Sequence, residues 1–150
     1  MKPIHLLLAS LSASLSSCAV PTGAVAPIVF TLEQAADSIP VAIGSTVTVE
    51  RLLLTFADVP DDSRCPTRVV CVWAGDATVS TGVTLTCTRA SPPCAVPELQ
   101  LKLHTNLEPR AGVYAGMEIR LVALMPVPEL PGEVRGDRYV AWFRIRPVTK

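Results

Sequence analysis

The stretch Asp58–Val79, which reads DVPDDSRCPTRVVCVWAGDATV, decides the fold of this chain. Its residues Pro60 to Ser63 are typical of a turn, because proline presets φ and the Asp and Ser side chains bond nearby backbone amides. Cys65 and Cys71 follow, and a disulfide across this short ring would stabilise the fold by roughly 2 kcal/mol. We therefore predict a stapled turn between two strands, with Trp73 packed beside it.

A metal or redox site is the alternative interpretation of the same two cysteines. Zinc sites favour C-x2-4-C pairs with further ligands, whereas Cys65 and Cys71 have the spacing C-x5-C. Four carboxylates that an enzyme or metal site could use lie nearby, namely Asp58, Asp61, Asp62 and Asp76. In such a sequence they serve more often as turn caps and ion-pair partners, so we expect neither a metal nor a cofactor.

The run DSRCPxxVxCVWAGxAxV, from Asp62 to Val79, resembles a signature of small uncharacterised bacterial secreted proteins and lipoproteins. A weaker resemblance extends to the Tyr-x-Ala-x-Phe segment from Tyr139 to Phe143. The resemblance implies an exported single β-domain and supplies no catalytic residue.

The N-terminal residues 1–18 have the layout of a signal peptide, with Lys2 followed by an apolar run and then small residues. Leu15-Ser-Ser-Cys18 resembles a bacterial lipobox, which implies that Cys18 is acylated and becomes the new N-terminus. Ala19 after it implies sorting to the outer membrane. Ordinary secretion with cleavage after Ala19 is the alternative. Residues 19–27 are then a tether and residues 28–150 the domain.

Lys and Arg number 13, and Asp and Glu also number 13, so the composition does not favour binding to nucleic acid. Lipidation of Cys18 would leave four cysteines of the five for two disulfides. We predict the local pairs Cys65–Cys71 and Cys87–Cys94, with a cross-sheet pairing such as Cys65–Cys87 left open.

Alternating apolar residues predict strands over most of the domain. The apolar set changes parity between Val49 and Leu52, which predicts a β-bulge near Glu50 and Arg51. The expected inward rows are Ala77, Val79, Thr81, Val83, Leu85 and Cys87; Leu99, Leu101 and Leu103; Met117, Ile119, Leu121, Ala123 and Met125; and Tyr139, Ala141, Phe143 and Ile145. His104 falls on a polar face, as a bystander. The pattern predicts an all-β fold, a single antiparallel β-sandwich of about seven or eight strands stapled by disulfides, with the immunoglobulin-like arrangement as one option.

Two features depart from an ordinary strand pattern. If the last two strands pair, their outer faces form a candidate partner-binding patch, made of Val122, Leu124, Val140, Trp142, Arg144 and Arg146. Coverage of this patch by the N-terminal segment or a loop is the alternative.

The second feature is Cys87-Thr-Arg-Ala-Ser-Pro-Pro-Cys94, which resembles the reactive loop of Bowman-Birk protease inhibitors. The resemblance places Arg89 in the position that enters a trypsin-like pocket. Ala90 replaces the usual serine and one residue is missing before Cys94, so a stapled hairpin tip is the alternative.

We therefore expect a non-enzymatic, lipid-anchored cell-envelope domain that binds another protein or plays a structural role. The alternatives are a serine-protease inhibitor using Arg89, and an enzyme or metal binder using the aspartate cluster.

Overall fold

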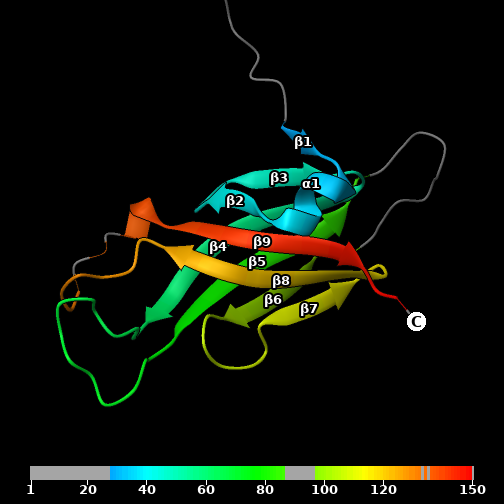
Figure 1. Ribbon diagram of the computed structural model, residues 1–150. Helices are drawn as coiled ribbons and strands as arrows, with labels where there is room; N and C mark the ends of the chain where they lie inside the picture. The colour runs from blue at the N-terminus through cyan, green and yellow to red at the C-terminus, as the bar shows by residue number, and fades with distance from the viewer. Residues whose placement is uncertain (1–27, 87–96, 133, 135, 150) are drawn as a thin grey trace, which may run out of the picture.

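The computed structural model describes residues 28–86, 97–132, 134 and 136–149 (Figure 1). These residues form nine strands, a short α-helix and a 3-10 turn. In chain order the elements are β1 (Val29–Phe30), α1 (Leu32–Asp37), β2 (Ile39–Ala42), β3 (Thr46–Val49), β4 (Leu52–Asp62), β5 (Ala77–Leu85), β6 (Leu99–His104), β7 (Ala111–Tyr114), β8 (Met117–Met125), η1 (Gly136–Arg138) and β9 (Val140–Pro147).

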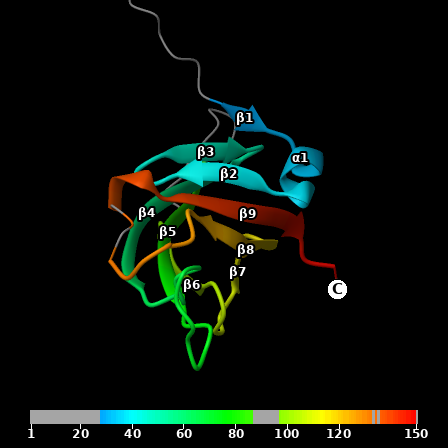
Figure 2. The ribbon, with the colours of Figure 1, turned by 60° about the vertical axis from the view of Figure 1, so that its left-hand side comes forward.

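The strands form two sheets that face each other (Figures 1 and 2). One sheet has the order β1-β3-β4-β5-β6 and the other the order β2-β9-β8-β7. All neighbours pair antiparallel except β1 and β3, which are parallel. The predicted all-β sandwich is confirmed, with nine strands among the described residues.

The core lies between the two sheets and consists of the inward rows of both. Phe56 and Phe143 meet there edge to face, with ring centroids 6.4 Å apart. The predicted inward row of the last strand is confirmed, since all four of its residues are buried. Other fully buried side chains are Ile39, Val41, Val49, Leu54, Val79, Val83, Leu103, Ile119 and Leu121. Burial of these rows is the main stabilising term of the fold.

The predicted bulge at Glu50 and Arg51 is wrong. These two residues form the turn of a hairpin, in which Val49 of β3 pairs with Leu52 of β4. Glu50 has a φ of 51°, as the tight turns of two-residue hairpins require. The change of parity therefore comes from a reversal of the chain and not from an extra residue within one strand.

A bulge does occur in β8, where the pairing with β9 shifts between Leu121 and Ala123. Beyond this point the positions that face the core shift by one residue, so that Leu124 is buried, at 3% exposure, and Met125 is exposed. The predicted inward row from Met117 to Met125 is therefore wrong after Leu121. The same shift removes Leu124 from the predicted outer patch.

Three connections come together at one end of the sandwich, at the lower left of Figure 1. They are residues 63–76 between β4 and β5, residues 105–110 between β6 and β7, and residues 126–132 after β8. Backbone hydrogen bonds from Thr67 N to Pro128 O (2.9 Å) and from Arg68 N to Glu129 O (3.2 Å) join the first connection to the third. We call the first connection the stapled loop and the whole region the stapled end.

Candidate binding site at the stapled end

The stapled loop is closed at its base by hydrogen bonds that continue the hairpin of β4 and β5. Ser63 N donates to Asp76 O at 2.7 Å, and Cys65 N donates to Ala74 O at 2.7 Å. A disulfide joins Cys65 to Cys71, with Cα atoms 6.0 Å apart, which confirms the predicted local pair. The loop is thus fixed by backbone pairing at its base and by a covalent bond farther out.

Gly75 is required at this base for two reasons. Its φ of 68° lies in the left-handed region, which a residue with a side chain enters at a cost. A Cβ atom on Gly75 would also collide with the backbone carbonyl of Ser63. The close approach of the two sides of the loop therefore depends on the glycine.

Arg64 fastens the loop to the opposite sheet. Its guanidinium forms a two-point ion pair with Asp62, through Nε to Oδ1 at 2.8 Å and Nη2 to Oδ2 at 2.7 Å. It also donates to Leu124 O at 2.6 Å and to Pro126 O at 2.8 Å. The Arg64 and Asp62 side chains are only 8% and 9% exposed, so this is a buried pair whose hydrogen bonds are satisfied by both sheets.

Tyr139, which precedes β9, completes this network by donating its hydroxyl to Asp62 Oδ2 at 2.8 Å. Burial alone would raise the pKa of the Asp62 carboxyl, but the hydrogen bonds from Arg64 and Tyr139 and the charge of Arg64 outweigh it and lower that pKa. Burial, together with the hydrogen bond to Asp62 and its negative charge, raises the pKa of Tyr139 to about 12. Asp62 is therefore ionised and Tyr139 neutral over the physiological range.

Asp76 organises the connection between β6 and β7. Its carboxylate accepts hydrogen bonds from Asn106 N (2.8 Å), Leu107 N (3.3 Å) and Thr105 Oγ1 (3.1 Å), and it lies 2.6 Å from His104 Nδ1. Burial raises the pKa of Asp76, but these hydrogen bonds outweigh it and the pKa is lowered. Asn106 Nδ2 in turn donates to Gly75 O at 2.6 Å. Asp76 thereby fastens the stapled loop to the neighbouring connection.

His104 is not the surface bystander that the strand pattern predicted. Its side chain is 24% exposed and is held by Asp76, the partner that fixes one ring nitrogen. The sequence did not indicate this contact, since the two residues are 28 positions apart and are brought together by the pairing of β5 with β6.

The four aspartates of the predicted acidic cluster are distributed over separate contacts. Asp62 and Asp76 belong to the two networks described above, and Asp58 accepts a hydrogen bond from Val59 N at 2.7 Å. Asp61 lies opposite Thr78 in the β4–β5 pairing. Within the described residues, no group of three or more His, Cys, Asp or Glu side chains is placed to hold a metal.

The outer part of the stapled loop is apolar and exposed. Val70 is fully exposed, Val72 nearly so, and Trp73 is 79% exposed. The prediction that Trp73 packs beside the disulfide is therefore wrong. We call these three side chains the loop tip. Trp is usually mostly buried, so a fixed loop that exposes one together with two valines is an unusual surface.

Two hollows border the stapled loop, and Ala74 and Asn106 line both of them. The first, of about 370 Å³, is bordered by Trp73, Gly75 and Leu107. The second, of about 420 Å³, lies between the loop, the β6–β7 connection and the end of β8. We call the second hollow the arginine groove. It is lined by Arg64, Cys65, Ala74, Thr105, Asn106, Arg110, Val122, Ala123, Leu124, Met125 and Val127.

The predicted patch on the last strand is only partly formed. β8 and β9 do pair, and Trp142 lies opposite Ala123 at 36% exposure. Val122 and Val140 are half-buried, but Leu124 belongs to the core. On the same face Glu118 forms ion pairs with Arg120 (3.4 Å) and Arg146 (3.0 Å), while Arg144 has a buried Nε without a hydrogen-bond partner among the described residues.

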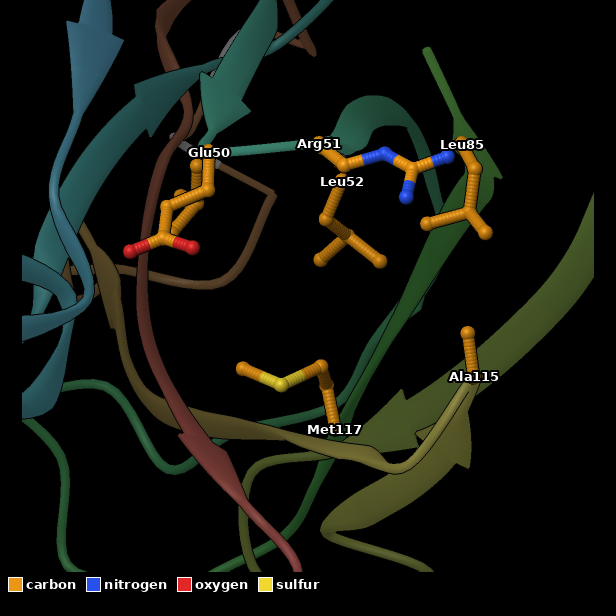
Figure 3. Close-up of a pocket in the computed structure, with 7 residues that line it drawn as sticks. Glu50, Arg51, Leu52, Leu85, Ala115 and Met117 are labelled. Atoms are coloured by element: carbon orange, nitrogen blue, oxygen red, sulfur yellow. The ribbon is translucent and has the colours of Figure 1, made fainter. Parts of the chain in front are cut away.

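A smaller apolar opening of about 210 Å³ lies between the two sheets, beside the hairpin turn of β3 and β4 (Figure 3). Leu52 and Leu85 point into it toward Met117, and Glu50 and Arg51 stand at its rim. Its lining provides no cluster of polar groups that would orient a ligand.

Several predicted site residues lie outside the described residues. They are Cys18, with its predicted lipid, and the second predicted disulfide, Cys87–Cys94, with Arg89 inside its ring. In the part of the chain that is described, no helix is long and apolar enough to cross a membrane.

No protein-family model, curated protein or solved structure matches this chain. The resemblance to small bacterial lipoproteins therefore stays a prediction.

Proposed function

We propose that this chain is a non-enzymatic, exported binding domain of the bacterial cell envelope, which recognises another protein through the loop tip. The observation that carries the proposal is the exposure of Val70, Val72 and Trp73 on a loop that is fixed at its base. Exposed apolar patches mark interaction sites, and Trp is the residue type most enriched among those that dominate binding energy.

The rigidity of the loop supports binding in particular. The loop conformation is fixed in the free domain by three sets of contacts: the disulfide, the Arg64 contacts to β8 and the Asp76 contacts to the β6–β7 connection. A preformed surface loses little conformational entropy on association, so more of the contact energy contributes to affinity. The buried carboxylates are at the same time occupied by donors of the fold, which favours a binding role over acid-base catalysis.

The location of the loop tip favours a protein partner over the membrane. We propose that Cys18 carries the lipid, that residues 19–27 form the tether, and that the domain is held at the outer membrane. The first described strand, β1, lies at the top of both Figure 1 and Figure 2, and the stapled loop at the bottom. A lipid joined to the chain ahead of β1 therefore leaves the loop tip on the far side of the domain from its attachment.

Site-specific photo-crosslinking in intact cells tests this function. A benzophenone amino acid is placed at Trp73 or Val72, and at Trp142 as the matched aromatic position on the last-strand face. We expect one discrete crosslinked product from positions 73 and 72 and none from 142. A product only from 142 would instead support the last-strand patch, and no product from any position would contradict a stable protein partner.

The anchor is tested separately. Intact-mass analysis of protein from the membrane fraction should give a diacylated N-terminal Cys18, and Cys18→Ser should remove the protein from that fraction. An unmodified N-terminus at Val20 would contradict lipid anchoring and leave the binding proposal unaffected.

A further inference from the structure

One guanidinium in the arginine groove, that of Arg110, forms no ion pair with the described residues. Among the polar side chains that line it, Arg64 is paired with Asp62, Thr105 with Asp76, and Asn106 with Gly75 O. Arg110 differs from them, since its Nε is buried and has no hydrogen-bond partner among the described residues.

No described carboxylate lies within ion-pair distance of the Arg110 guanidinium. The nearby Glu108 accepts instead from the backbone N–H of Arg110, at 2.9 Å. A buried donor of a charged group that lacks an acceptor is costly to the fold. The buried Nε is closed to solvent, so a ligand in the groove would bind the other donors of this guanidinium, which have no carboxylate partner among the described residues.

Apart from these polar side chains, the groove is lined by apolar residues. Val122, Met125 and Val127 line it from β8 and the segment after it, and Ala74 lines it from the stapled loop. Beyond Ala74 and Asn106 lies the first hollow with Trp73 and Leu107. The surface therefore offers an arginine in one hollow and, in the neighbouring one, apolar side chains that include Trp73 of the loop tip.

We propose that the arginine groove binds a carboxylate of the partner protein, an Asp or Glu side chain flanked by apolar residues, with Arg110 as its recognition group. This inference rests on the proposed function and specifies the chemistry of the partner. Charge complementarity supports a carboxylate because guanidinium and carboxylate form strong, directional hydrogen bonds. A nucleic-acid phosphate is disfavoured by the equal numbers of acidic and basic residues in the chain.

The test is an NMR titration of the ¹⁵N-labelled domain with two model peptides, acetyl-Leu-Asp-Leu-amide and acetyl-Leu-Asn-Leu-amide. We expect shifts in the amides of Asn106, Arg110 and Ala123, and about tenfold weaker binding of the Asn peptide, as for loss of one charge-assisted hydrogen bond. Arg110→Gln should reduce the affinity for the Asp peptide to that for the Asn peptide. Arg144→Gln is the matched control, because Arg144 also has an unpartnered Nε but lies on the outer face of β9.

The comparison of the two peptides on the unaltered domain does not depend on the folding of any variant. Equal affinity for both peptides, or no shifts at millimolar peptide, would overturn the proposal. Sodium acetate binding as tightly as the Asp peptide would also overturn it, since the groove would then be a site for small anions. If Arg110→Gln leaves the crosslink from position 73 intact, the protein-binding function holds and only the carboxylate inference fails.

Discussion

Replacement of Arg64 by methionine is the perturbation that most directly tests how the stapled end is held. Methionine keeps much of the volume but leaves Asp62 buried without its counter-charge, and the carbonyls of Leu124 and Pro126 without their donor. Removal of one partner from a buried ion pair costs about 3–5 kcal/mol. We expect about 3 kcal/mol, the lower end, because Tyr139 still donates to Asp62.

For a domain of about 120 residues this loss corresponds to a fall in Tm of roughly 12 °C. Thermal and urea unfolding followed by far-UV circular dichroism would measure it. Arg68→Met is the matched control, because Arg68 forms a 3.7 Å pair with Glu129 in which both side chains are mostly exposed, and its loss should cost at most about 0.5 kcal/mol.

The double variant Asp62→Asn/Arg64→Met provides the refutation. Because asparagine leaves no buried charge, the double variant should be at least about 1.5 kcal/mol more stable than the sum of the two single losses predicts. If Arg64→Met costs no more than Arg68→Met, or if the single losses simply add, Arg64 does not hold the loop in the way described.

Four other perturbations have expected outcomes. Gly75→Ala should destabilise the domain by about 2 kcal/mol or more in urea unfolding, whereas Gly44→Ala, also at positive φ but in open space, should cost only about 1 kcal/mol; equal losses would contradict the collision with Ser63. Because the pKa values of Asp62 and Asp76 are lowered in the fold, the stability that these carboxylates contribute should be complete above about pH 4 and should be lost as the pH falls through the lowered values. Asp62→Asn or Asp76→Asn should therefore make the free energy of unfolding depend less on pH in the acid range. Tyr139 should contribute stability below about pH 10 that is lost as the pH rises toward its pKa of about 12, a loss that Tyr139→Phe should remove. If the Arg89 loop acts as a protease inhibitor, oxidised domain at micromolar concentration should inhibit trypsin and Arg89→Ala should not; a flat titration would leave the loop as a turn.

Much of the fold follows from strand periodicity. The alternation from Ala77 to Leu85 and from Tyr139 to Ile145 identified core strands, because an antiparallel sheet with one buried face imposes a period of two. The short spacing of Cys65 and Cys71 between turn and strand signals likewise indicated the local disulfide.

The errors occurred where the backbone departs from that period without a marker in the sequence. A hairpin turn usually contains Asn or Gly, but here Glu50 takes the positive φ, so the turn resembled a bulge. The bulge after Leu121 contains neither Gly nor Pro, so the strand pattern places Leu124 on the wrong face. One shifted residue exchanged the inner and outer sides of the remaining strand.

The candidate site was harder to predict because its contacts join distant parts of the chain. Arg64 binds carbonyl groups of residues 60 and 62 positions away, and a carbonyl group has no signature in the sequence. The sequence predicts Trp73 packed beside the disulfide, because tryptophan is usually mostly buried, but Trp73 is exposed on a loop that these contacts hold at its base. The unpaired Nε of Arg110 is visible only once the neighbours of that residue are known.

The most direct test of loop-tip recognition is competition for the crosslink formed from position 73. Purified, oxidised domain is added in increasing amounts to envelope preparations that carry the crosslinker variant, and the yield of the product is measured. Unaltered domain and Trp142→Ala should suppress the product equally, and Trp73→Ala should require at least about tenfold more protein, as expected for loss of a dominant binding residue. Equal competition by Trp73→Ala and the unaltered domain would contradict recognition through the loop tip.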